Sequence, residues 1–343
     1  MAEGSAVRCC TSDPPPFIKK EVTSSMEARE HPLQRTLPMT LLATACVTFW
    51  GSAATFIKLG YAAMSVDGQD AAGQLLFAGC RFTLSGLMTL AALWLLRRRI
   101  PLPRRDGAAK RVSLLALTQT FGQYVCFYIG VAHTSGTNSA IISGCSAFIT
   151  ILAAALLFRT ERLNGYKITG CLLGVAAVVL MNLAGLSQGV RFTLAGEGMV
   201  FASLISNVLS TNLIKRFSQE DDPLVLSGWQ FTCGGLALVL TGLAMGGRLD
   251  LLAPRALPIV IYLAFVSAFS YGMWSVLLKY NPVSRVTVFN SANPLFGVFF
   301  SALLLGETAQ AKQPATLLAL ALVCCGVYLV NAHGSREAKP TQK

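Results

Sequence analysis

The chain has 343 residues, of which 53% are hydrophobic and 13% are charged, and its formal net charge is +12. Soluble domains carry about 25% charged residues, so this composition excludes an ordinary soluble domain and favours a protein that crosses a membrane several times. A basic charge of this size would suggest nucleic acid in a soluble protein. Here basic loops between membrane spans explain it, and no nucleic-acid partner is expected.

The first 36 residues are polar and include Pro14-Pro15-Pro16 and Lys19-Lys20. No short apolar core with a cleavage site follows the basic residues, so the pattern does not indicate a signal peptide. We predict a disordered cytoplasmic tail over residues 1–36 and a second cytoplasmic tail over residues 333–343.

Ten apolar segments lie between these tails, and most are close to the roughly 20 residues that a helix needs to cross about 30 Å of hydrocarbon. The segments are residues 37–61, 75–96, 112–132, 137–158, 166–185, 194–214, 224–245, 258–280, 283–305 and 314–332. Their connections are short and leave no room for a soluble domain. The expected fold is therefore an all-α membrane protein with ten transmembrane helices.

Lys and Arg are distributed unevenly between the two sides of these segments. With the N-terminus inside, 22 of the 28 basic residues fall in cytoplasmic loops and tails. The opposite side holds only Arg191, Arg248, Arg255 and Lys312. Because basic loops tend to stay in the cytoplasm, we expect both termini to be cytoplasmic, in the plasma or inner membrane of the cell.

The ten segments form two related sets of five. The run from Thr137 to Asn182 is similar to residues 283–331, and Glu161 corresponds to Glu307. In the second segment, residues 81–87 (Arg-Phe-Thr-Leu-Ser-Gly-Leu) correspond to residues 230–236 (Gln-Phe-Thr-Cys-Gly-Gly-Leu) in the seventh. Five is odd, so the second set enters the membrane upside down. We therefore predict inverted repeats over residues 37–185 and 194–332.

With this doubled pattern the sequence resembles the drug/metabolite transporter superfamily, in its ten-helix form with two EamA-type domains. The residues that carry the resemblance are Trp50-Gly51, Lys58, Arg81, Glu161, Gly170, Gly174, Asn293-Pro294, Leu305-Gly306-Glu307 and Gly326. The resemblance covers about residues 37–332. It implies transport of amino acids, other small metabolites or toxic compounds, usually outward.

One position departs from that family pattern. Such domains often carry a proline in the fourth span, but here Ala147-Phe148 stands opposite Asn293-Pro294. The sequence therefore predicts a kink in the ninth span and leaves open whether the fourth span has one.

Arg81 lies about six residues into the second segment. An ionisable side chain inside a membrane is costly, so it should face a cavity or a partner. It could anchor a substrate carboxylate, or it could be a structural cation. Lys58 lies nearer the outer surface and reaches it more easily.

No Asp or Glu lies in the middle of any segment. This absence favours a facilitator or exchanger over a proton-coupled antiporter, and it disfavours organic cations as substrates.

Neutral polar and aromatic residues complete the predicted site, which we expect to be a polar, aromatic-walled cavity between the repeats. The alternative for each of these residues is packing between helices. The expected substrate-binding residues are Trp50, Arg81, Gln119, Gln123, Tyr124, Tyr128, Asn138, Asn207, Tyr271, Trp274, Asn290 and Asn293.

Other chemistry finds little support in the sequence. No metal-ligand spacing, nucleotide-binding loop or nucleophile motif occurs, so we expect no catalytic residue, no metal and no cofactor. Glu161 and Glu307 are expected to anchor helix ends or to pair with Arg159 or Arg162. Gly170 and Gly174 match the small-residue motif of helix dimers, which leaves both a homodimer and internal packing open.

The sequence therefore predicts a secondary transporter, an exporter or facilitator of small metabolites such as amino acids. It would work by alternating access at a central cavity between the repeats. Three alternatives stay open. A nucleotide-sugar antiporter would exchange a nucleotide sugar for its monophosphate, a receptor or scaffold would usually add a folded extramembrane domain, and a membrane enzyme would need a convergent catalytic set.

Overall fold

The computed structural model describes residues 31–99, 101–103, 105–134, 136–182, 193–306 and 313–332. Within these ranges the chain is helical and has no strand. The predicted tails lie outside the described residues except for 31–36, where Pro32–Gln34 form the 3-10 turn η1 just before the first long helix. Glu307 also lies outside them.

The first repeat crosses the molecule five times. Its helices are α2 (Thr36–Ala63), α3 (Ala71–Arg97), the series α4, η2 and α5 (Ala108–Leu115, Ala116–Gly122 and Gln123–Ala132), the pair α6 and α7 (Gly136–Gly144 and Ser146–Leu156), and α8 (Gly165–Met181). Asp70 caps α3 by accepting the Gly73 N–H at 2.9 Å. A side-chain cap satisfies backbone donors that the first turn leaves free, so α3 begins four residues before the predicted segment.

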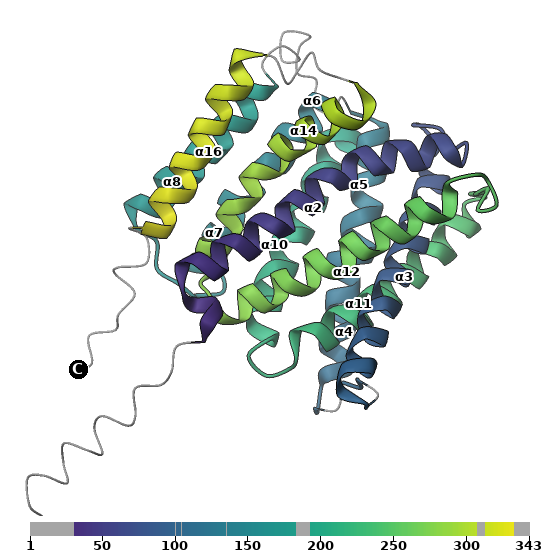
Figure 1. The fold of residues 1–343 in the computed structure, drawn as a ribbon, viewed down its shortest axis with the longest axis horizontal. Helices are drawn as coiled ribbons and strands as arrows, with labels where there is room; N and C mark the ends of the chain where they lie inside the picture. The colour runs from purple at the N-terminus through teal and green to yellow at the C-terminus, as the bar shows by residue number, and fades with distance from the viewer. Residues whose placement is uncertain are drawn as a thin grey trace, which may run out of the picture.

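The second repeat also crosses five times, and its helices lie among those of the first repeat (Figure 1). Its helices are η3 and α10 (Leu194–Gly198 and Met199–Phe217), α11 (Pro223–Ala244), α12 (Ala256–Tyr280), the series α13, η4 and α14 (Val283–Thr287, Val288–Ala292 and Asn293–Leu305), and α16 (Pro314–Ala332). Asp222 caps α11 by accepting the Leu224 N–H at 2.8 Å, and Pro223 fits the first helical position because it needs no donor.

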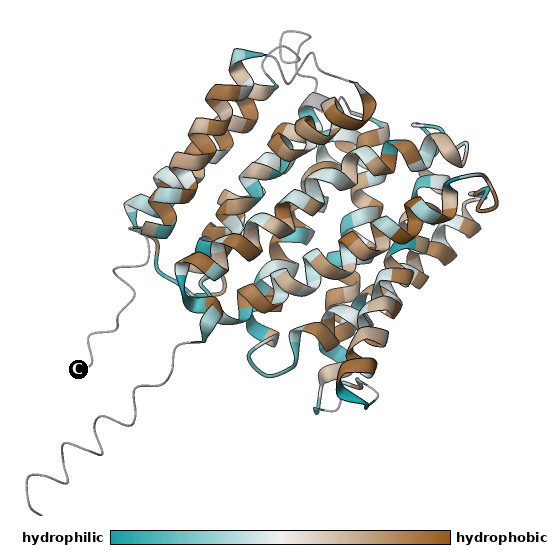
Figure 2. Ribbon diagram, in the orientation of Figure 1, coloured by the Kyte–Doolittle hydropathy of each residue, from teal (hydrophilic) through white to brown (hydrophobic). Residues whose placement is uncertain are grey.

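Nine of the described helical runs are long and apolar enough to cross a membrane. The remaining one, α8, is a shorter apolar helix of 17 residues. Figure 2 shows that apolar residues follow the bodies of the helices while hydrophilic ones gather mostly at their ends and in the loops. The protein is thus an all-α membrane protein with ten helices in two inverted repeats of five, as the sequence predicted.

Several of the membrane-crossing paths are interrupted. The fourth path breaks at Cys145, between α6 and α7, and the ninth passes through the 3-10 turn η4 just before Pro294. These interruptions fall at corresponding places when Ala147 is aligned with Asn293. The fourth path is therefore interrupted even though it has no proline. Breaks of this kind are tolerated inside a membrane where the backbone is buried in protein or lines a cavity.

Glycines allow two helix pairs to approach closely. On α3 and α11, a Cβ at Gly86 would lie 2.5 Å from the Thr232 backbone nitrogen. On α8 and α16, a Cβ at Gly170 would lie 2.7 Å from the Gly326 oxygen, and a Cβ at Gly326 would lie 2.6 Å from the Gly170 oxygen. Gly170 therefore packs within the chain, against the α16 helix that runs beside α8 at one edge of the molecule (Figure 1).

The first helix of the chain runs through the middle of the assembly. In Figure 1, α2 lies between α12 and α14, and both helices contact it. Gly51 permits the α14 contact, because a side chain there would meet the backbone of Phe296 and Gly297 at 3.0 Å. This packing places Trp50, the preceding residue, where the two repeats meet.

Candidate functional site

Arg81 is buried in α3, with 5% of its surface exposed. Its guanidinium carbon lies 4.4 Å from the centroid of the Phe82 ring and 5.7 Å from that of Tyr124. Rings at these distances attract a cation through their negative faces. The buried Nε has no hydrogen-bond partner among the described residues. Among the described residues, Arg97, Arg111 and Lys167 form ion pairs, and Arg81 does not.

Aromatic side chains from both repeats form a continuous series of ring contacts that begins beside this guanidinium, at Phe82 and Tyr124. The first repeat supplies four and the second three, and we call these seven residues the aromatic cluster: Trp50, Phe82, Tyr124, Tyr128, Phe231, Tyr271 and Trp274. The Trp50 ring lies 4.9 Å from Tyr271 and 5.0 Å from Trp274, as centroid distances. The cluster therefore joins α2, α3 and α5 to α11 and α12.

The centre of the aromatic cluster lies where equivalent parts of the two repeats touch. Phe82 and Phe231 occupy corresponding positions, and their rings stack with centroids 5.4 Å apart and planes 7° apart. Tyr124 of the third span and Tyr271 of the eighth share a hydrogen bond of 2.9 Å between their hydroxyls. Equivalent residues that touch lie near the pseudo-twofold axis. In inverted-repeat transporters the substrate site lies at the interface that this axis defines.

The position equivalent to Arg81 is Gln230, and its contacts are different. Gln230 is fully buried, and its amide nitrogen donates to Gln119 Oε1 at 2.8 Å. Its amide oxygen accepts the Thr120 hydroxyl, also at 2.8 Å. This network bonds η2 to α11 and engages both the nitrogen and the oxygen of the Gln230 amide. Gln119 was predicted to bind substrate, and its contacts here are those of a residue that joins two helices.

The other predicted polar residues lie outside the aromatic cluster. Asn207 of α10 donates to Gln123 of α5 at 3.3 Å, which makes a separate pair. Asn290 lies in η4 and Asn293 begins α14, and both side chains are partly buried. Of the twelve predicted residues, the structure therefore brings six together at the axis: Trp50, Arg81, Tyr124, Tyr128, Tyr271 and Trp274.

Asn138, the remaining predicted residue, belongs to a bonded group at the end of the molecule that the charge distribution assigns to the outside. It donates to Glu197 Oε1 at 2.9 Å, and the Thr134 hydroxyl donates to the same oxygen at 2.5 Å. Glu197 Oε2 accepts the N–H of Thr193 at 2.9 Å. Glu197 begins the sixth path, so these bonds connect the two repeats.

A second carboxylate connects the repeats at the opposite end. Glu161 follows α7 and forms an ion pair of 2.8 Å with Lys167. It also accepts the N–H of Ser284 at 2.9 Å and the hydroxyl of the same residue. Ser284 belongs to α13 in the second repeat, so Glu161 joins the repeats across this end. Glu161 thus anchors the start of α13, which is one of the two roles expected of it. The other expectation, a pair with Arg159 or Arg162, was wrong, because Lys167 on the first turn of α8 is the residue that meets the carboxylate.

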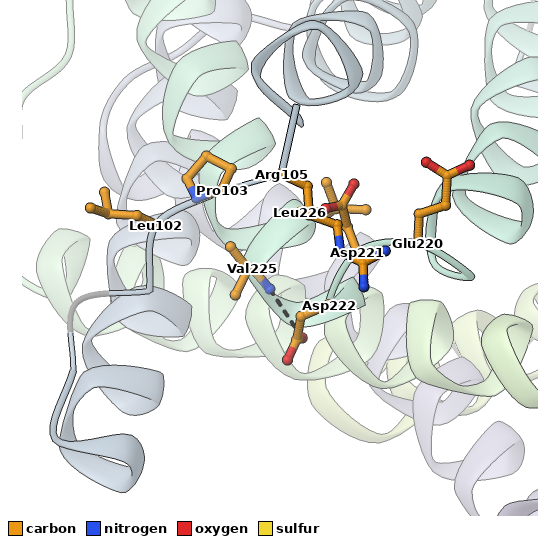
Figure 3. Close-up of a pocket in the computed structure, with 8 residues that line it drawn as sticks. All are labelled: Leu102, Pro103, Arg105, Glu220, Asp221, Asp222, Val225 and Leu226. Carbon is orange, nitrogen blue, oxygen red and sulfur yellow. Dashed lines mark hydrogen bonds between the residues drawn. The ribbon is translucent and has the colours of Figure 1, made fainter. Parts of the chain in front are cut away.

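Two open pockets lie elsewhere. The first, of about 290 Å³, lies beside the loop between α10 and α11 and is lined by Arg105, Leu226 and the acidic run 220–222 among others (Figure 3). The acidic side chains already have partners, because Arg111 binds Asp221 at 2.5 Å and Arg97 binds Asp222 at 2.6 Å. The second is a mostly apolar pocket lined by Leu76, Cys80 and the segment near Gly247. Neither includes the aromatic cluster, whose rings pack directly against one another.

The comparison with protein families decides the identity. The sequence profile of the EamA-like transporter family matches residues 37–183 and again residues 194–332, which is most of the chain. The chain belongs to the EamA-like transporter family. It is therefore a multi-pass membrane transporter of small molecules rather than an enzyme, as predicted.

Individual relatives agree with the family match. A WAT1-related chloroplastic protein of Arabidopsis thaliana is 27% identical over 82% of this chain and 67% of its own length. A probable amino-acid metabolite efflux pump of Salmonella typhimurium is 28% identical over 86% of this chain and 95% of its own length. A solved crystal structure has a TM-score of 0.72 with this EamA-like chain at 16% identity, and covers 88% of this chain and 100% of that one, which shows a shared fold.

Sequence reasoning did not include Phe82 and Phe231 in the site of this EamA-like transporter. The signal was present, because both lie in the motif that relates the second and seventh spans. Two aromatic residues at equivalent positions of an inverted repeat meet when the pseudo-twofold axis passes between them, and here they stack.

Proposed function

We propose that this protein is a secondary transporter, an exporter or facilitator of small metabolites such as amino acids. It works by alternating access in the cell membrane with both termini in the cytoplasm. The observation that carries the proposal is the position of Arg81, a buried cation among aromatic residues of both repeats near the pseudo-twofold axis. A small molecule bound there contacts both halves at once, so relative movement of the halves can expose it to either side.

The bonded groups at the two ends support this mechanism. Glu197 joins the repeats at one end and Glu161 joins them at the other. The structure thus has both ends connected and the aromatic cluster packed between them. Breaking the Glu161 bonds while keeping those of Glu197 would open one side, and the reverse would open the other. Each carboxylate can be bonded in one half of a transport cycle and released in the other.

The distribution of acids favours exchange or facilitated transport. Within the described membrane-crossing helices, Glu197 is the only acidic residue, and hydrogen bonds engage both of its carboxylate oxygens. A carboxylate deep in the membrane is the usual carrier of a coupling proton. Transport here should therefore follow the solute gradient or exchange one solute for another.

Counterflow in proteoliposomes tests the proposal. The purified protein is reconstituted, loaded with unlabelled amino acids and related metabolites, and supplied with the labelled compound outside, with and without a proton gradient. We expect saturable uptake that internal substrate accelerates, because an alternating-access carrier returns faster when loaded. Leu320→Ala, on an exposed face of α16, serves as the control and should transport like the wild type. Flux that does not saturate, or no flux for any compound, would contradict the proposal.

A further inference from the structure

We propose that the aromatic cluster selects substrates of one charge type, namely monoanionic carboxylates that carry a planar aromatic group and lack an ammonium group. The inference rests on the proposed function, since it assigns a substrate class to the same site. It narrows the broad class of small metabolites to aromatic monocarboxylates and leaves out the amino acids themselves, because each of those carries an ammonium group.

The charge of the site is the first reason. Arg81 is always protonated and has no ion-pair partner among the described residues. A single carboxylate would therefore neutralise the site. A zwitterion would bring an ammonium group, and a buried charge without a counter-ion is costly. The described spans offer that ammonium no free carboxylate, because both Glu197 oxygens are already bonded.

Two free donors are the second reason. The Arg81 Nε and the Trp50 indole nitrogen are both buried without a hydrogen-bond partner. Buried polar groups in folded proteins nearly always have one, so each unpartnered donor requires an explanation. The two are linked through a pair of tyrosines: the Tyr271 ring lies 4.9 Å from that of Trp50, its hydroxyl bonds that of Tyr124 at 2.9 Å, and the Tyr124 ring lies 5.7 Å from the Arg81 guanidinium carbon. A carboxylate has two acceptor oxygens, and it can satisfy donors that come from different helices.

The equivalent position in the other repeat provides an internal comparison. Gln230 shows that a polar side chain at this place on the helix can be fully satisfied by its neighbours, Gln119 and Thr120. A purely structural residue at position 81 could use the same arrangement. Instead this repeat carries a permanent cation with an unpartnered nitrogen. The difference between the two copies indicates a ligand for Arg81.

The walls of the site determine the shape of the ligand. Phe82 and Phe231 stack with planes 7° apart, and the rings of Tyr124 and Tyr271 lie 4.6 Å from Phe82 and 4.9 Å from Phe231, respectively. Flat rings pack well on other flat rings, and a planar ligand can replace a ring contact that opens when the repeats move. A saturated ring of similar size fits such walls less well.

A matched series of four compounds tests the proposal by isothermal titration of the full chain in lipid nanodiscs. The compounds are 3-phenylpropionate, phenylalanine, phenethylamine and 3-cyclohexylpropionate, which vary charge and planarity around one skeleton. We expect 3-phenylpropionate to bind about tenfold or more tightly than the other three. Phenethylamine cannot accept the ionic hydrogen bond from Arg81, phenylalanine adds an ammonium group without a counter-ion, and 3-cyclohexylpropionate lacks the flat ring. Equal or tighter binding of phenylalanine, or no binding of 3-phenylpropionate, overturns the proposal.

Substitutions test which residues give the preference for 3-phenylpropionate. Arg81→Gln, which introduces the residue of the equivalent position, should weaken 3-phenylpropionate about tenfold or more, and Trp50→Phe should weaken it less. Arg248→Gln removes a charge from an exposed position away from the aromatic cluster and should change nothing. An unchanged affinity of Arg81→Gln for 3-phenylpropionate overturns the assignment of the carboxylate to Arg81. If that variant does not fold, the ranking of the four compounds with the wild-type protein decides. Counterflow of zwitterions but not of 3-phenylpropionate overturns this inference while the transport proposal stands, whereas no counterflow at all contradicts the transport proposal.

Discussion

Residues at equivalent positions of the two repeats can make different contacts. Arg81 and Gln230 hold corresponding places, but Gln230 bonds η2 to α11 while the Arg81 Nε has no partner. Membrane helices use amides such as Gln119 to join each other, so a polar residue at depth is not in itself a ligand site. A polar residue joins helices when its donors and acceptors already have partners in the protein, and it is a candidate ligand site when they do not.

Gln119→Leu tests this distinction. The change removes the acceptor of the Gln230 amide and should lower the free energy of unfolding by about 1 kcal/mol, the size measured for hydrogen bonds between membrane helices. Substrate affinity should stay at the wild-type value. Thermal unfolding in detergent gives the first quantity and titration the second. A loss of affinity with unchanged stability would make Gln119 a substrate contact.

At the scale of helices, the crossing of α3 and α11 holds the aromatic cluster in place. These helices carry Arg81, Phe82 and Phe231, and they approach closely because Gly86 and Gly235 present no side chain. A Cβ at Gly86 would lie 2.5 Å from one backbone atom of α11 and 2.6 Å from another. Backbone cannot move aside as a flexible side chain can. The close crossing is therefore a condition for the site.

Gly86→Val should force α3 and α11 apart and lower stability by about 1 to 3 kcal/mol, the usual cost of overpacking. The variant should also lose binding, because Phe82 would no longer stack on Phe231. The matched control is Gly68→Val, in a loop where a Cβ would meet nothing within 4 Å. Unfolding midpoints in detergent compare the two. Equal midpoints would show that the crossing tolerates separation.

The helices themselves were predictable from the sequence, and their side-chain partners were less so. Runs of about 20 apolar residues predict the spans. The basic loops predict which ends of the spans face the cytoplasm, and the repeat predicts which spans correspond. Arg81 and the tyrosines could be selected because a cation and polar rings at depth are rare. The Gln230 partner of Gln119 could not be foreseen, because it depends on which helices are neighbours. For the same reason Arg159 and Arg162 were chosen for Glu161 in place of Lys167.

For the whole molecule, the proposed mechanism predicts that the bonded groups at its two ends determine which conformation is populated. Glu161 and Lys167 are both buried, and removing one member of a buried pair leaves the other charge uncompensated. Loss of this pair should therefore favour conformations in which that end is open to water. Among the described residues, Glu197 holds the other end through hydrogen bonds and without an ion pair.

Glu161→Gln should expose the end of the molecule at which Glu161 joins the repeats, and Cys171 provides a native reporter of this change. Cys171 is buried in α8, one helical turn after Lys167, the ion-pair partner of Glu161. We expect N-ethylmaleimide to modify it faster in the variant than in the wild type, as followed by mass spectrometry of the peptide. Glu220→Gln, which removes an exposed ion pair on the same side, is the control. Identical rates in all three proteins would contradict this role of Glu161.

The difference between Arg81 and Gln230 also has a consequence for the direction of transport. If the two inverted repeats were identical, the twofold rotation would make the inward-open and outward-open states equivalent, and a solute would meet the same site from either side. Under the proposed function, a solute that binds Arg81 approaches this residue past different neighbours from each side of the membrane, because the equivalent position holds Gln230. We then expect the half-saturation concentrations measured from the two faces to differ. Detailed balance requires the maximal rates to compensate, so the protein can be kinetically one-sided without an energy source.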